Sequence, residues 1–192
     1  YGEKELTHAQ PHQISNWGIA RAFQNIELFG GLSVLDNLLL ARHQKLNYNF
    51  LQAVFYFGKA SRIEAENRAF VEDVIDFMEL EAYRHSTVGN LSYGVQKRVE
   101  VARALTLAPN ILLLDEPMAG MNIEEKEDMV RFVLDIQRER EITVVLIEHD
   151  LGVVMDISDK IYVLDFGELI GSGTPEEVAK NPDVIEAYIG EE

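Results

Sequence analysis

The chain has 192 residues, of which 47% are hydrophobic, and a formal net charge of −16 at pH 7. This hydrophobic content is enough for one substantial core, whereas the negative charge disfavours DNA, RNA and anionic lipid as partners. There is no cysteine, which excludes disulfides and cysteine-ligated metal sites and favours a cytosolic protein.

The first part of the chain combines a mixed region with a helical block. From Tyr1 to about Phe29 no single periodicity dominates. From about Leu35 to Tyr83, apolar side chains recur at helical intervals, as at Ile63, Phe70, Val71, Val74 and Met78.

No apolar run in the sequence approaches the roughly 18 residues that span a bilayer, so we expect no direct membrane insertion.

The second half of the chain alternates helices with apolar strands. Helices are expected over about 95–107 and 123–139, and the stretches ILLLDEP and ITVVLIEHD each predict a buried strand. This alternation predicts a parallel sheet covered by helices on both faces. The predicted fold is therefore α/β with an inserted helical subdomain.

The C-terminal stretch carries turn and capping signals. KIYVLDFGELIGSG predicts a hairpin that turns near Gly167. In TPEEV, Thr174 is the expected N-cap, Pro175 the first helical residue and Glu177 the partner that completes a capping box.

Acidic residues follow both predicted parallel strands. Asp115 and Glu116 end one strand, and Glu148, His149 and Asp150 follow the other. At the carboxyl end of a strand, one carboxylate can hold Mg²⁺ through water while its neighbour polarises an attacking water. On these residues alone, helix capping by the carboxylates and a structural role for His149 are the simpler interpretations.

The spacing of several motifs resembles the nucleotide-binding subunit of ATP-binding cassette (ABC) transporters. LSYGVQKRVEVARAL contains the stretch Leu91 to Val95, which stands where that family has its LSGGQ signature. ILLLDE matches the Walker B strand, His149 the switch histidine, Gln24 in RAFQN the Q-loop glutamine, and AGMN, ending at Asn122, the D-loop. Five motifs in family order make the resemblance specific, and it extends over nearly the whole chain.

Several departures from the general family pattern indicate one branch of it. Tyr93 replaces the first glycine of the signature, and LSYG is similar to the form found in importers of branched-chain amino acids. Asn122 stands in place of the usual aspartate, and the ending GTPEEVAKNPDVIEAYIG is also similar to that branch. Val95, where the signature glutamine is expected, is less familiar. The resemblance implies an ATP-binding subunit that couples ATP hydrolysis to import of branched-chain or other amino acids.

The resemblance also implies roles for individual residues. In this family two subunits enclose two ATP molecules, and each signature loop faces the nucleotide of the opposite subunit. Backbone N–H groups at a helix start, with glycine allowing close approach, suit a γ-phosphate. The residues implied to contact nucleotide in this way are Ser92, Tyr93, Gly94 and Asn122. A plain N-cap role for Ser92 is compatible with this.

The catalytic and metal-binding roles follow the same resemblance. Glu116 is expected to polarise the attacking water, and Asp115 to hold Mg²⁺. His149 is expected to contact the γ-phosphate, and Gln24 to reach both the metal and the water. ATP and Mg²⁺ are thus the implied cofactors.

The implied partners are membrane permease subunits and a second ATP-binding subunit, identical or related, at the cytoplasmic face of the cell membrane. The helical block would form the groove for the permease. Its apolar stretch FLQAVFYFG, residues 50–58, is expected either to face that permease or to pack inside the block.

One family motif is absent from these 192 residues. The phosphate-binding Walker A loop, G-x-x-x-x-G-K-[ST], does not occur in the sequence. By the resemblance, the chain consists of a partial β-rich part with the Q-loop (1–34), a helical subdomain ending in the signature loop (35–93) and an α/β core (94–192). We therefore expect these residues alone to be catalytically incomplete. We also expect one strand position of the sheet to be unfilled, which would leave an exposed edge through which chains could associate.

Two other classes of function stay open at this point. The chain could be a nucleotide-incompetent module that lends its signature loop to an intact subunit. It could also be a soluble ABC-type ATPase of DNA repair or translation. Against the latter stand the charge of −16 and the lack of a heptad-bearing insertion.

Overall fold

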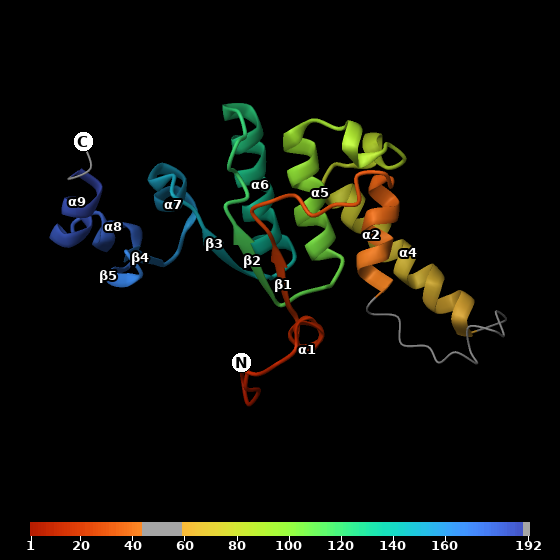
Figure 1. The fold of residues 1–192 in the computed structure, drawn as a ribbon, viewed down its shortest axis with the longest axis horizontal. Coiled ribbons are helices and arrows are strands. Elements are labelled where there is room, and N and C mark those ends of the chain that lie inside the picture. Colours follow the sequence, from red (N-terminus) through yellow and green to blue (C-terminus); the bar gives the residue numbers. More distant parts are fainter. Residues whose placement is uncertain (44–58, 190–192) are drawn as a thin grey trace. The chain divides into compact units, whose positions relative to one another are not determined.

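The computed structural model describes residues 1–43 and 59–189 and divides the chain into two units, Tyr1–Ile147 and Glu148–Glu192 (Figure 1). Each unit is described by itself below. The stretch 50–58, expected to dock or to pack, lies outside the described residues. The three-part division at residues 34 and 93 stays a prediction.

A parallel sheet of three strands organises the first unit, in the order β1 (Ile19–Ala22), β2 (Ile111–Asp115), β3 (Thr143–Ile147). Ala20 pairs with Leu112, and Leu112 pairs with Val144. Leu112 and Leu114 of the central strand are fully buried. The predicted α/β fold with a parallel sheet is confirmed, and strands far apart in the chain end at one edge.

Helices pack around this sheet. In chain order they are α1 (Pro11–Asn16), α2 (Val34–Arg42), α4 (Lys59–Phe77), the 3-10 turns η2 (Glu81–Tyr83) and η3 (Val88–Asn90), α5 (Tyr93–Leu105) and α6 (Ile123–Glu139). Figure 1 shows α2, α4 and α5 grouped together, and α5 also packs against β1 and β2. The helix predicted over 123–139 is confirmed, and its predicted apolar face is buried at Met129, Phe132, Val133 and Ile136.

Side-chain caps fix where the helices nearest the sheet edge begin. The Ser92 side chain accepts from the backbone N–H of Val95, and that of Asn122 from Glu125. Such caps satisfy N–H groups that have no partner within the helix. Since Ser92 is the cap, α5 begins at Tyr93, two residues before the predicted start.

The sheet departs from the prediction that helices cover both faces. On β3, Val145 and Ile147 have exposed fractions of 48% and 59%. Within the described part of the chain, β3 pairs only with β2, so its outer edge carries no strand. The apolar run at β3 predicts burial on both sides, whereas one face of this strand is exposed because every second residue of it points to that face.

The second unit contains α7 (Leu151–Ile157), β4 (Ile161–Asp165), β5 (Glu168–Gly173), α8 (Pro175–Val178) and α9 (Pro182–Ile189). β4 and β5 form the predicted antiparallel hairpin, turning at Phe166 and Gly167, whose φ angles are +44° and +86°. The Thr174 capping box with Pro175 at the first turn is also confirmed. In neither unit does a described helix have the length and apolarity needed to cross a membrane.

Candidate functional site

The ends of β1 and β2 bring together two predicted site residues that are 92 positions apart in the chain. Gln24 lies two residues beyond β1, and Glu116 follows β2 directly. The Nε2 amide of Gln24 donates to Oε2 of Glu116 across 2.5 Å. A carboxylate and a carboxamide therefore meet at the sheet edge where parallel α/β sheets bind ligands.

Asp115 has a partner that the sequence did not indicate. The guanidinium of Arg21, on β1, donates to Oδ2 of Asp115 across 2.5 Å. Arg21 is also stacked over the Phe23 ring, 4.6 Å from its centroid. The β-sheet register explains the contact, because Arg21 lies opposite Leu113, two residues before Asp115 on the same face. Only the register, which the sequence did not provide, could have predicted this pair.

The backbone of Glu116 is held in an uncommon conformation. Its φ angle is +45°, in the left-handed region that non-glycine residues rarely adopt. The N–H of Glu116 donates to the carbonyl oxygen of Ile147 at 2.9 Å, and its own carbonyl oxygen accepts from Lys97 Nζ at 3.2 Å. Backbone strain of this kind concentrates at functional sites, where the surroundings enforce it.

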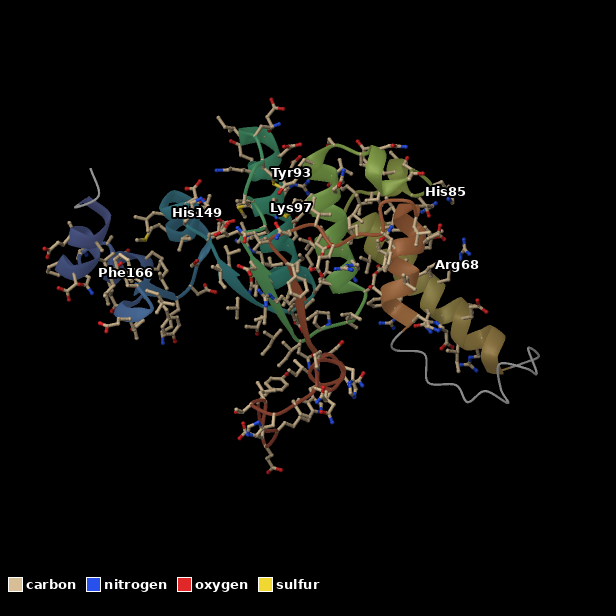
Figure 2. The ribbon with its side chains drawn as sticks, in the orientation of Figure 1. Arg68, His85, Tyr93, Lys97, His149 and Phe166 are labelled. Atoms are coloured by element: carbon tan, nitrogen blue, oxygen red, sulfur yellow. The ribbon has the colours of Figure 1, made fainter. Side chains whose placement is uncertain are left out.

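Lys97 is a site residue that sequence reasoning missed. It lies on α5 with a side chain that is only 1% exposed, and its Nζ also donates to the carbonyl oxygen of Gln24 at 2.6 Å. Figure 2 labels it beside Tyr93, whose ring centroid is 5.9 Å from Nζ. A signal was available: Lys97 shares the helical spacing of Gly94, Val101 and Ala104, all buried.

Later turns of α5 also contact the loop that follows β1, at Glu27. Arg103 donates from Nη1 to the carbonyl oxygen of Glu27 at 3.0 Å and from Nη2 to Glu100 Oε1 at 2.6 Å. Burial raises the pKa of the Glu100 carboxyl, although the nearby Arg103 opposes that shift. One face of α5 thus contacts the loop at Gln24 and at Glu27.

The predicted signature residues form the N-terminus of α5. Ser92 Oγ accepts from the backbone N–H of Val95 at 3.4 Å, which confirms the N-cap part of its expected role. Gly94 is buried, and a Cβ added there would lie 2.3 Å from Oε1 of Glu125. The Tyr93 side chain is partly exposed and its ring contacts Gly120, where an added Cβ would lie 3.1 Å from Cε1.

Two further predicted residues, Asn122 and His149, have partners within their own local segments. Asn122 caps α6, with its Oδ1 accepting from the N–H of Glu125 at 2.9 Å. His149 belongs to the second unit, where its exposed ring has Nδ1 4.0 Å from Oε2 of Glu148. Their expected contacts with nucleotide stay predictions.

The donor set at the sheet edge fits Mg²⁺ that arrives with a nucleotide. No group of three His, Asp or Glu side chains that could hold a metal occurs within residues 1–43 and 59–189. Mg²⁺ commonly takes one or two protein oxygens and completes its octahedron with water and phosphate oxygens. Asp115 and the Gln24 carboxamide can supply such oxygens, whereas the sequence contains no G-x-x-x-x-G-K-[ST] loop to hold the phosphates themselves.

Comparison with known sequences identifies the protein family to which the chain belongs. The sequence profile of the ABC transporter family matches residues 1–119, and that of the branched-chain amino acid ATP-binding cassette transporter matches residues 168–192. The chain belongs to the ABC transporter family and represents its nucleotide-binding subunit.

Relatives narrow this similarity further. The chain is 40% identical over 188 residues to the high-affinity branched-chain amino acid transport ATP-binding protein BraF of Pseudomonas aeruginosa, covering 98% of this chain and 74% of BraF. It is 37% identical over 189 residues to LivG of Escherichia coli, a protein of the same description, with coverages of 98% and 74%. The predicted resemblance to this branch of the family is confirmed.

Solved structures agree with the sequence relatives. The ADP conformation of MJ1267, an ATP-binding cassette of an ABC transporter, superposes with a TM-score of 0.78 at 32% identity, covering 97% of this chain and 74% of that one. A nucleotide-free ATP-binding cassette from an ABC transporter gives 0.80 at 30% identity, with coverages of 99% and 76%. The fold is thus that of an ABC cassette.

Proposed function

We propose that this chain is part of the ATP-binding subunit of an ABC importer, which couples ATP hydrolysis to the transport of branched-chain or other amino acids. The observation that carries the proposal is the contact between Gln24 and Glu116 beside Asp115. The cargo class rests on the names of relatives such as BraF and LivG.

Glu116 is the proposed general base of hydrolysis. Its carboxylate lies at the sheet edge and can orient a water for attack on a terminal phosphate, with the Gln24 carboxamide 2.5 Å away to fix its direction. Mg²⁺ held by Asp115 and Gln24 would neutralise charge on the phosphate oxygens. Arg21 donates a hydrogen bond to one oxygen of Asp115.

The start of α5 is the proposed contact with a nucleotide on a second subunit. The helix has 13 residues, so its N-terminal N–H groups and dipole favour an anion near Ser92, Tyr93 and Gly94. Ser92 Oγ would contribute one more hydrogen bond. Asn122, at the start of α6, and His149 are proposed to contact nucleotide as well.

The proposed partners are a second ATP-binding subunit and membrane permease subunits on the cytoplasmic face of the membrane. The relatives are transport ATP-binding proteins, which act as components of transporters. With a net charge of −16, nucleic acid is not a proposed partner.

The test is hydrolysis by the full-length subunit, compared with its Glu116→Gln variant, together with a titration of Mg-ATP. We expect the wild type to hydrolyse ATP and the variant to bind ATP without turnover. The same titration on the 192-residue chain is expected to give no binding up to about millimolar nucleotide, since its sequence lacks the phosphate loop. A full-length subunit that neither binds nor hydrolyses ATP would overturn the proposal.

A further inference from the structure

The ammonium group of Lys97 is the point where parts of several motifs meet. Its Nζ donates to the carbonyl oxygens of Gln24 and Glu116, at 2.6 and 3.2 Å. The same group lies 5.9 Å from the ring centroid of Tyr93, one turn earlier on α5. A single side chain therefore contacts the loop after β1, the loop after β2 and the start of α5.

The burial of this ammonium group makes its hydrogen bonds important for stability. Lys97 is 1% exposed, and a buried ammonium is strongly unfavourable unless its donors find acceptors. Charge-assisted hydrogen bonds to carbonyl oxygens are about twice as strong as those between neutral groups. The two loops are therefore held to α5 by interactions that the buried charge makes costly to break.

The two carbonyls belong to the residues whose side chains face one another at the site. The side chains of Gln24 and Glu116 are hydrogen-bonded to each other, and their backbone carbonyl oxygens both accept from Lys97. The uncommon φ of +45° at Glu116 needs such support from its surroundings. A shift of Lys97 would move both backbones together.

Tyr93 extends the connection to the loop before α6. Its ring contacts Gly120, whose φ of +77° and close contact leave little room for a side chain. A change in the position of the Tyr93 ring would therefore alter the space at Gly120 as well as the contact with Lys97.

We infer that Lys97 is a positioning residue, which fixes the backbones of Gln24 and Glu116 relative to each other and to the start of α5. Its catalytic consequence rests on the proposed function. The residue touches no substrate in this role and acts through Glu116 and Gln24.

The first test measures ATP hydrolysis by the full-length subunit carrying Lys97→Met, Lys97→Gln or Lys97→Arg. Lys97→Met keeps the length of the side chain and removes its donors, so we expect kcat to fall about tenfold or more while KM changes by less than about threefold. Lys97→Arg keeps the charge and donors and is expected to recover most of kcat. Lys180→Met removes an exposed lysine and is the control.

A second measurement does not depend on hydrolysis. Hydrogen exchange of the backbone amides in 24–27 and at Glu116 and Met118 should be faster in Lys97→Met than in the wild type, and unchanged in Lys180→Met. If the wild type lacks ATPase activity, the proposed function fails while this measurement still decides the positioning role.

The outcomes are separable. Slower turnover at unchanged KM, with faster exchange in both loops, supports the inference. Unchanged kcat and unchanged exchange overturn it, as does a rise in KM alone. If Lys97→Met does not fold, Lys97→Gln, which keeps a donor amide, is judged by the same criteria.

Discussion

The guanidinium of Arg21 lies 2.5 Å from the Asp115 carboxylate that is proposed to hold Mg²⁺. Both side chains are partly exposed, at 49% and 23%, so the ion pair adds little to the stability of the fold. Its main effect is that Arg21 competes with Mg²⁺ for the Asp115 carboxylate. Replacing Arg21 by Met should therefore lower the Mg²⁺ concentration at half-maximal ATP hydrolysis, by about threefold or more.

The measurement is a Mg²⁺ titration of ATPase activity in the full-length subunit. Arg131→Met is the matched control, because Arg131 forms a comparable exposed pair with Glu79. A half-activating concentration that rises in Arg21→Met would show that Arg21 assists metal binding, contrary to this prediction.

Glu116→Gln should abolish turnover and leave nucleotide binding intact. Glutamine can still form a hydrogen bond with Gln24 but cannot accept a proton from water, so kcat is expected to fall about 100-fold or more. Steady-state kinetics and ATP binding of the full-length subunit measure both effects. Glu124→Gln, at an exposed position in the first turn of α6, should leave both unchanged.

Gly94→Ala should destabilise the fold through the start of α6. The added Cβ would lie 2.3 Å from Oε1 of Glu125, whose carboxylate accepts from the Asn122 N–H in the capping box. Displacing that carboxylate should lower the free energy of unfolding by about 1 kcal/mol. A double-mutant cycle with Glu125→Ala tests the cause, since the cost should shrink when Glu125 is already absent. Equal costs in both backgrounds would assign the effect elsewhere.

Asn122 offers a way to separate capping from nucleotide contact. Asn122→Ala removes the cap on α6 and should cost about 1 kcal/mol of stability, whereas Asn122→Ser keeps a capping oxygen and should cost less. If Asn122 also contacts nucleotide, ATPase activity should fall in both variants. Activity lost only in Asn122→Ala would limit its role to the helix cap.

Glu100 should make stability depend on pH. Burial raises the pKa of this carboxyl above its ordinary value of 4.5, with Arg103 opposing the shift; the charge of Glu27 adds to the shift and a hydrogen bond from the Glu27 backbone opposes it. The stability contributed by the protonated form is complete below the unfolded pKa and is lost as pH rises through the raised folded pKa. As the pH rises above the ordinary pKa of 4.5, Glu100→Gln should therefore gain stability relative to the wild type.

Chemical denaturation at several pH values measures this difference. Arg103 attracts the ionised carboxyl only, so this attraction is already included in the net rise of the pKa and does not change the sign of the comparison. A difference that does not change with pH would contradict the raised pKa. Glu124→Gln serves as the exposed control.

The sequence by itself determined the local elements and the family. The periodicity of 123–139 predicted α6 with its buried face, because an amphipathic helix must place its apolar side chains on one side. Capping signals at Thr174 and Glu177 were also sufficient, since their partners lie within one turn. Motif order similarly identified the ABC family, because signature, Walker B and Q-loop residues are local patterns.

Only the tertiary structure decided which of these patterns meet and what supports them. The contact of Gln24 with Glu116 and the pairing of Arg21 with Asp115 depend on strand order and register, which no local pattern encodes. The exposed face at Val145 and Ile147 likewise depends on which elements cover β3. Lys97 carried a helical signal but no acceptors in its own segment, because its carbonyl partners come from two other strand ends folded against α5.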